Sequence, residues 1–347
     1  MQRGPGIPPV SIVFDSDLGN QIDDVLALAL LYGLDGKGEC RMVATTVSKP
    51  NLKSAQLSEV IGRFYAGEVS AAFNASGRTL PVGLAGSGTH NEDTPMLAVL
   101  GKRTADGKPA YIHGIERVAD TADPVDVLRN ALSAQHPGNA IVVVTGPASN
   151  LAALLKFPYA APLITERARL LVIAAGAYPE GKAEPGILAD ISAARKLFAE
   201  WPGPIVAVGS EVGEAVPFPG AAIEKDFAWS EAHPVADAYR ANHQMPYDAS
   251  TTAMAAVLYA VRAKDNPFQL SQPGSISVLD DGRTKFTASA SGKHRFLIVD
   301  PAHKSAIQQT YIEIASAKPV PRAPRFRRPI QQQQEQQQTP PPAQKKQ

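Results

Sequence analysis

The chain has 347 residues, of which 44% are hydrophobic and 19% charged, and its formal net charge is +1. This is an ordinary globular composition with enough apolar residues for a large core. The single cysteine, Cys40, excludes a disulfide framework and a multi-cysteine metal site, so any metal must be held by oxygen or histidine. No apolar run approaches the roughly 18 residues of a membrane span, and the first residues lack a secretory signal. We therefore expect no membrane partner and a cytoplasmic location, with an exported form left open.

The near-zero net charge hides a difference between the body of the chain and its C-terminal tail. Residues 318–347 hold seven Lys or Arg and one acidic residue, Glu335, so the tail carries +6 and residues 1–317 carry −5. A mildly acidic body disfavours a nucleic-acid partner, which would require a basic stripe. The tail is rich in Pro, Gln and Arg and has little to bury. We expect one domain over residues 1–317 and a disordered tail over 318–347, with an anionic surface as the less favoured role for its arginines.

Short apolar runs alternate with helix-length segments over residues 10–208. The runs are bounded by polar or Gly residues, as buried parallel strands are, and cover residues 10–14, 42–46, 140–144, 170–174 and 205–208. The helical segments between them cover residues 23–33, 54–66, 124–135, 150–157 and 191–200. This alternation predicts an α/β fold with an open, mostly parallel central sheet and helices on both faces.

Residues 275–299 have a different pattern. In SISVLDDGRTKFTAS, Asp-Gly stands between two alternating runs, which is typical of a β-hairpin. The segment HRFLIVD predicts a third strand, and a helix is expected over residues 303–315. We expect a short antiparallel addition to the main sheet.

The stretch IVFDSDLGNQIDDVLALALL is the most informative for chemistry. Asp15 and Asp17 leave a predicted buried strand, and Asp23 and Asp24 begin an apolar helix. Four carboxylates within ten residues repel one another unless a positive group lies among them. Ligands of open α/β sheets bind beyond the carboxyl ends of the strands, and oxygen ligands without sulfur or nitrogen favour Ca²⁺ or Mg²⁺.

Two alternatives account for parts of this cluster. Asp23 and Asp24 could merely stabilise a helix N-terminus, by up to about 1 kcal/mol, but that explains two acids and not four. A haloacid-dehalogenase-like phosphatase also begins with Asp-x-Asp after a strand. Its chemistry would need a metal and lysine constellation that the sequence does not place.

The second informative stretch is AIVVVTGPASNLAALL, in which a strand ends, Thr145-Gly146-Pro147 turns, and Ser149 or Asn150 could cap the next helix. Together the two stretches resemble the nucleoside hydrolase family, the inosine–uridine-preferring N-ribohydrolases. That family has D-x-D-x-G-(x)-D-D near its N-terminus and T-G-P-x-(S/T)-N-L-A in its middle. The segments NLKSAQLSEVIGRFYAG, AEPGILADISAARKLF and MPYDASTTAMAAVLYAV are similar to further family segments in the same order.

The resemblance implies a calcium site. Asp17 matches the residue that binds Ca²⁺ and takes the proton from a metal-bound water. Asp24, the backbone carbonyl of Thr145, and Asp248, at the start of a late helix, match the other ligands. Asp15 would position these ligands from behind.

The resemblance also implies how substrate is held. Asp23, Asn51 and Glu184 fall where the family binds the ribose hydroxyls. Cleavage of an N-glycosidic bond passes through an oxocarbenium-like state, which requires a positioned water and carboxylates near the sugar. Tyr247 stands where one branch has a His suggested to protonate the departing base, although packing at a helix start is the favoured alternative for this tyrosine.

The chain departs from the family pattern at four positions. Gln21 replaces an acid, Gly186 replaces an Asn, Tyr247 replaces the His, and Ala174 replaces a Met. The predicted calcium ligands are all present. We therefore expect metal binding to be kept more faithfully than the choice of substrate.

The resulting hypothesis is a Ca²⁺-dependent enzyme that hydrolyses a ribonucleoside to ribose and a free base, as a dimer or tetramer. The main alternative is a calcium- and ribosyl-binding protein with impaired catalysis, motivated by Gln21, Gly186 and Tyr247. In a third hypothesis the tail binds a partner and the domain serves as a scaffold. The haloacid-dehalogenase-like phosphatase is the weakest of these hypotheses.

Overall fold

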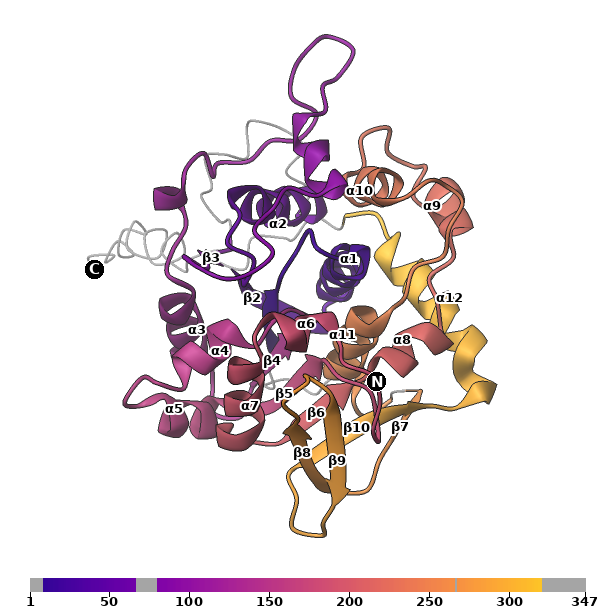
Figure 1. Ribbon diagram of the computed structural model, residues 1–347. Helices are drawn as coiled ribbons and strands as arrows, with labels where there is room; N and C mark the ends of the chain where they lie inside the picture. The colour runs from indigo at the N-terminus through magenta and orange to yellow at the C-terminus, as the bar shows by residue number, and fades with distance from the viewer. Residues whose placement is uncertain (1–8, 67–79, 266, 320–347) are drawn as a thin grey trace, which may run out of the picture.

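The computed structural model describes residues 9–66, 80–265 and 267–319, and in these residues ten strands form one sheet (Figure 1). The strand order is β3-β2-β1-β4-β5-β6-β10-β8-β9, and β7 pairs with β10 off this path. The strands are β1 Val10–Ser16, β2 Cys40–Val47, β3 Val82–Leu84, β4 Ala140–Val144, β5 Ala168–Ala174, β6 Ile205–Val208, β7 Phe268–Leu270, β8 Gly274–Val278, β9 Thr284–Ala288 and β10 His294–Val299.

The sheet is parallel over most of its width. Every neighbouring pair from β3 to β10 runs parallel, whereas β8, β9 and β7 are antiparallel to their partners. The predicted α/β class and the antiparallel C-terminal addition are confirmed. One detail differs, because the third predicted strand of that addition, β10, pairs in parallel with β6 and so extends the main sheet.

Helices cover both faces of the sheet (Figure 1). Side chains of β1 alternate between the two cores. Ile12 and Phe14 lie in the core on one face of the sheet, and Val13 lies in the core on the other face. The helices are α1 Ile22–Gly36, α2 Leu52–Tyr65, α3 Pro124–Ser133, α4 Ser149–Leu154, α5 Ala160–Arg167, α6 Pro185–Ala189, α7 Ile191–Glu200, α8 Ser210–Ala215, α9 Gly220–Asp226, α10 Pro234–Asn242, α11 Thr252–Arg262 and α12 Lys304–Ala315.

The predicted strands and helices are all present, with shifted ends, but several short elements were not predicted. β3 and β7 have three residues each, and α6 and α8 have five and six, which is too short for a periodic pattern. None of the helices in the described part of the chain is long and apolar enough to cross a membrane. Apart from residues 318 and 319, the predicted tail lies outside the described residues.

The expectation that a late helix begins at Asp248 is wrong. Helix α11 begins at Thr252, and Asp248 lies four residues before it in an irregular segment. The physical reason lies in α1, because the Asp23 carboxylate accepts hydrogen bonds from the backbone N–H groups of Ala253 and Met254. These bonds satisfy the first turn of α11 and set where that helix starts.

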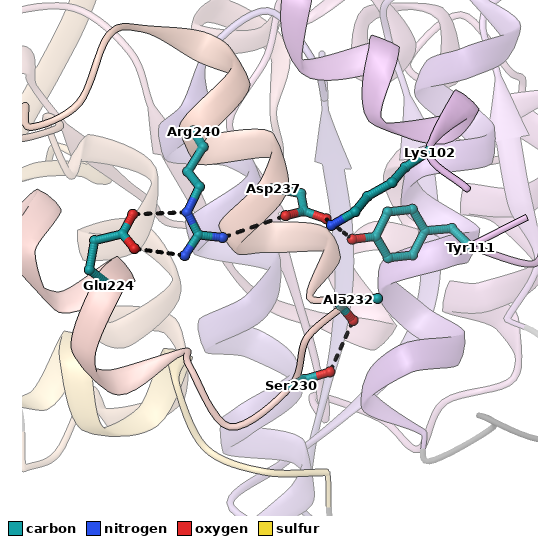
Figure 2. Close-up of polar contacts among 7 residues, drawn as sticks. All are labelled: Lys102, Tyr111, Glu224, Ser230, Ala232, Asp237 and Arg240. Carbon is teal, nitrogen blue, oxygen red and sulfur yellow. Dashed lines mark hydrogen bonds and ion pairs between the residues drawn. The ribbon is translucent and has the colours of Figure 1, made fainter. Parts of the chain in front are cut away.

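Asp237 on α10 joins this helix to a distant loop (Figure 2). Its Oδ2 accepts from Lys102 Nζ over 2.6 Å and from the Tyr111 hydroxyl, and its Oδ1 accepts from Arg240 over 3.5 Å. Arg240 also makes a two-pronged contact with Glu224 on α9, over 2.8 and 3.0 Å. The approach to α10 is ordered by a bond of 3.0 Å from Ser230 Oγ to Ala232 O. This network stabilises the helical layer over α1.

His233, just before α10, is buried in an aromatic cage. It is 1% exposed, and the rings of Phe64, Phe227 and Trp229 lie 4.5 to 5.0 Å from its own. Neither ring nitrogen has a hydrogen-bond partner among the described residues. Burial lowers the pKa of His233 to about 3, so the ring stays neutral in the folded protein while it takes up a proton in the unfolded chain below about pH 6.5.

This cage predicts a pH dependence of stability. Because the unfolded state binds the extra proton between pH 6.5 and 3, His233 should lower the free energy of unfolding by up to about 1.4 kcal/mol per pH unit as the pH falls through this range. His233→Leu should remove that component from urea unfolding measured between pH 7 and 4.5. The exposed His136→Leu serves as control, and an unchanged slope in His233→Leu would contradict the assignment.

Candidate active site

Asp15, Asp17 and Thr145 lie at the edge of the sheet where β1, β2 and β4 end. The N–H of Ser48 donates to Ser16 O over 2.9 Å, and the N–H of Thr145 donates to Asp15 O over 2.8 Å. Parallel strands end at the same edge, so the acidic segment after β1 lies between the loops that follow β2 and β4. The acidic segment therefore occupies the centre of this edge.

A tight turn directs the chain from Asp17 into α1. The N–H of Asn20 donates to Asp17 O over 3.1 Å, and Gly19 has a φ of +97°, a value that favours glycine. The Asn20 side chain turns back, and its Nδ2 donates to Asp17 Oδ2 over 2.8 Å. Lys49 Nζ donates in turn to Asn20 Oδ1 over 2.5 Å.

Asp15 lies behind the site and is fully buried. Its Oδ2 accepts from Thr46 Oγ1 over 2.5 Å and from Asn150 Nδ2 over 2.8 Å, which ties β1 to β2 and α4. Burial, with a smaller contribution from the charge of Asp17, raises the pKa of Asp15 to about 7. The predicted capping role of Ser149 or Asn150 is wrong: neither makes a cap bond for α4, because Asn150 is used by Asp15 and Ser149 donates to Asp190.

Asp17 and Asp24 are buried carboxylates with unused oxygens. Asp17 Oδ1 and Asp24 Oδ2 have no hydrogen-bond partner among the described residues. Burial raises the pKa of Asp17, whereas the Asn20 bond and the Lys49 charge lower it. Burial and then the charge of Asp17 raise the pKa of Asp24 well above its usual range. Such a pair is stable only with protons or a cation beside it.

Asp23, unlike Asp24, has both carboxylate oxygens in hydrogen bonds. Its two oxygens accept from Ala253 N over 2.6 Å and from Met254 N over 3.3 Å. Burial raises its pKa to about 7, against the lowering effect of these N–H groups. Asp23 thus joins the first turn of α1 to the first turn of α11 at the wall of the site.

A cavity of about 240 Å³ opens beside these carboxylates, and four predicted site residues line it: Asp23, Asp24, Thr145 and Glu184. Glu184 caps α6 through bonds to Gly186 N and Ile187 N, and burial raises its pKa. The lining also includes polar residues that were not predicted, namely Ser210, Ser250, Thr252, Lys182 and Glu214. Lys182 and Glu214 are exposed and form an ion pair of 3.1 Å.

Three predicted residues have other partners. Asp248 is exposed and accepts from Gly220 N over 3.0 Å. Asn51 caps α2 through Lys53 N, and its Nδ2 donates to Asn91 O over 2.8 Å, so both ends of its amide are used. The third residue is Tyr247. Asp248, Asn51 and Tyr247 are all absent from the residues that line the cavity.

Tyr247 packs against a neighbouring tyrosine, and packing was the alternative favoured for this residue. It stacks on Tyr239 with ring centres 4.3 Å apart, and each hydroxyl donates to the other residue's carbonyl over 2.7 Å. Asn242 Nδ2 also approaches the Tyr247 hydroxyl, at 3.3 Å.

The donors present fit a hard divalent cation at Asp17 and Asp24. Two buried carboxylate oxygens without partners lie beside Thr145 at the strand ends, and oxygen is the ligand type that Ca²⁺ and Mg²⁺ prefer. In the ranges that the structure describes, no three His, Cys, Asp or Glu side chains are grouped closely enough to hold a metal. The described residues therefore offer a cation two carboxylate oxygens, fewer than the roughly six to eight ligands that Ca²⁺ takes.

The turn after β4 depends on a glycine. A Cβ on Gly146 would lie 2.4 Å from Asp17 N and 2.6 Å from Ser48 Oγ. We predict that Gly146→Ala lowers the free energy of unfolding by about 1–3 kcal/mol, since the backbone on both sides must move apart. Gly101→Ala is the matched control, because nothing lies within 4 Å of its Cβ. Equal urea midpoints for the two variants would contradict this packing.

The family model of the inosine-uridine preferring nucleoside hydrolases matches residues 12–310. No curated protein matches the chain by sequence.

Solved structures of low sequence identity share the fold. A plant nucleoside hydrolase, PpNRh1, has a TM-score of 0.64 at 20% identity, covering 89% of this chain and 100% of its own. The purine-preferring ribonucleoside hydrolase from Gardnerella vaginalis has a TM-score of 0.62 at 20% identity, covering 88% and 99%. The type III effector protein XopQ, solved with adenosine diphosphate ribose, has a TM-score of 0.64 at 14% identity, covering 91% and 96%.

The family match includes the acidic segment that also suggested a haloacid-dehalogenase-like phosphatase, and it assigns this segment to another family. The chain belongs to the inosine-uridine preferring nucleoside hydrolase family, and thus to the hydrolases that act on N-glycosyl bonds.

Proposed function

We propose that the protein is a Ca²⁺-dependent hydrolase that cleaves a ribonucleoside into ribose and a free base. The observation that carries this proposal is the pair of partnerless buried oxygens on Asp17 and Asp24, of which Asp24 lines a cavity at the strand ends. Buried anionic oxygens without donors are costly unless a cation binds them. Membership of a nucleoside hydrolase family supports the reaction class.

Asp17, Asp24, the Thr145 carbonyl oxygen and Asp248 would hold the cation. Ca²⁺ commonly takes six to eight oxygen ligands, so these four leave positions for water and substrate. When bound there, Ca²⁺ would orient a water molecule and lower its pKa. Asp248 would contribute only after exchanging its bond with Gly220 N for the cation, because the described residues do not group it with Asp17 and Asp24.

Asp17 would act as the general base. Its Oδ2 is held by Asn20, while Oδ1 is free to accept the proton of the attacking water. Water oxygen then bonds to the anomeric carbon as the bond from that carbon to the base nitrogen breaks, and the electron pair leaves with the base. Asp15 keeps β1 aligned through Thr46 and Asn150, as its expected positioning role requires.

Asp23, Asn51 and Glu184 would bind the ribose hydroxyls and orient the anomeric carbon. Asp23 and Glu184 are in the cavity wall, where their carboxylates would also stabilise positive charge developing on the sugar ring. Asn51 stands outside the cavity lining and would have to exchange its contact with Asn91 for the substrate. Tyr247, the proposed contact of the departing base, would likewise have to exchange its bond with Tyr239 O for the substrate.

The proposed substrates are ribosyl compounds, because the ligands named for two similar structures share a ribose. The Gardnerella structure is described as a purine-preferring ribonucleoside hydrolase, and XopQ binds adenosine diphosphate ribose. A test panel should therefore contain purine and pyrimidine ribonucleosides and this ribosyl nucleotide. We further propose a cytoplasmic homo-oligomer.

The decisive test is release of reducing sugar from this panel, with and without a calcium chelator. We predict that the chelator abolishes release and that Ca²⁺ restores it, with Mg²⁺ added in parallel to identify the metal. Asp17→Asn should lower kcat by about 10²–10⁴-fold, the usual contribution of a general base, without lowering Tm. Asp106→Asn, in an exposed loop, is the control.

Two outcomes would contradict the proposal. Full activity of Asp17→Asn would remove this residue from the role of base. Tight Ca²⁺ binding with no release from any member of the panel would favour the calcium- and ribosyl-binding protein, for which a ligand that raises Tm without being consumed is the positive test.

A further inference from the structure

Lys49, in the loop after β2, is the one lysine or arginine that is fully buried among the described residues, with 1% of its surface exposed. A buried ammonium costs several kcal/mol unless acceptors or opposite charges surround it. The charges that act on it are Asp17, Glu92 and Asp93, and its bonded partner is Asn20. Its placement against the acidic segment therefore calls for an explanation beyond core packing.

Asn20 stands between a group that only donates and a group that only accepts. Lys49 Nζ donates to Asn20 Oδ1 over 2.5 Å, and Asn20 Nδ2 donates to Asp17 Oδ2 over 2.8 Å. A carboxamide has one acceptor end and one donor end, an ammonium has no acceptor, and an ionised carboxylate has no donor. Only one orientation of the Asn20 amide satisfies both neighbours, and Lys49 enforces it.

The backbone fixes this chain of bonds at its centre. The turn from Asp17 to Asn20 requires the positive φ of Gly19, and Thr94 Oγ1 donates to Gly19 O over 2.5 Å. Asn20 is thus held at its backbone by the turn and at its side chain by Lys49. As a result one oxygen of Asp17 is tied, and the other, Oδ1, is buried and without a partner.

We propose that Lys49 and Asn20 are positioning residues that hold Asp17 Oδ2 and so present Oδ1 to the reacting water. This inference rests on the proposed function, in which Asp17 is the general base. Neither residue touches the substrate; both act through Asp17. Lys49 acts by orienting Asn20, so the two residues form one functional unit.

The test compares Asn20→Ala, Lys49→Met and the double variant in the full-length protein. Each single variant should lower kcat about 10- to 100-fold with KM changed by less than about twofold, since ground-state binding of ribose is left intact. The double variant should be no more than about threefold slower than the slower single variant, because both changes break the same chain of bonds. Lys37→Met removes an exposed ion pair with Glu313 and is the control for loss of a lysine.

An isosteric variant tests the orientation of the amide directly. Asn20→Asp keeps the shape of the side chain and an acceptor for Lys49, but it removes the donor toward Asp17. We expect kcat to fall at least as far as in Asn20→Ala. Near wild-type kcat in Asn20→Asp would overturn the inference.

Calcium binding, measured by titration calorimetry without substrate, gives a readout independent of turnover. Lys49→Met should bind Ca²⁺ as tightly as the wild type or more tightly, because a positive charge near the carboxylates is removed. Loss of Ca²⁺ binding together with a lower Tm would mean that Lys49 only maintains the fold, and would overturn the inference. Wild-type kcat in Asn20→Ala would do the same.

These outcomes separate the inference from the proposed function. An inactive wild-type protein would overturn both. An active wild type with an equally active Asn20→Ala would overturn the positioning role alone.

Discussion

Burial of four carboxylates at one edge of the sheet is the constraint on which the rest of the site depends. Asp15, Asp17, Asp23 and Asp24 are each less than 9% exposed. Charges removed from water must be compensated locally, and the structure compensates three of the four in different ways. Asp15 receives two side-chain donors, Asp23 receives backbone N–H groups of another helix, and Asp17 receives Asn20.

The elements around the site supply the hydrogen-bond donors that these carboxylates need. The start of α11 faces Asp23, so the position of this helix is coupled to the first turn of α1. The loop after β2 brings Lys49 inward, and the turn after β4 approaches Asp17 so closely that only glycine fits at position 146. Compensation is incomplete only at Asp17 Oδ1, Asp24 Oδ2 and Asp15 Oδ1. Two of these three oxygens belong to the residues proposed to hold the cation.

Much of this arrangement was predictable from local sequence. The parallel strands have continuous apolar runs, and the acidic segment between a strand and an apolar helix has few structural explanations. The rule that ligands bind at the carboxyl ends of strands then brings Asp24 and Thr145 together without knowledge of the fold's details. Glu184, which no strand end predicts, was placed by the family resemblance, and it lines the same cavity.

The parts of the site that were not predicted depend on contacts between segments that are far apart in the sequence. A single lysine in a loop has no local signature, and Lys49 becomes informative only once Asn20 is seen beside it. Asn150 follows a turn as a capping residue would, yet the Asp15 carboxylate, 135 residues away in sequence, is its partner. Similarly, the family resemblance assigned Asp248 to a helix start, and nothing in its own segment reveals that Asp23 bonds to the first turn of a helix that begins at Thr252.

The departures from the family pattern are distributed unevenly, and this bears on specificity. The lining of the cavity includes Asp23, Asp24, Thr145 and Glu184, all of which match the pattern. Gln21 and Ala174, which depart from it, also line the cavity, and they do so together with Ser250 and Thr252. In the proposed mechanism the cation and the ribose depend on the residues that match, so the base would contact other residues of the lining. Changes at Gln21 and Ala174 beside retained carboxylates are what a hydrolase with an unchanged reaction and a different leaving group would require, because selectivity among bases is set by differential contacts to the part of the substrate that differs.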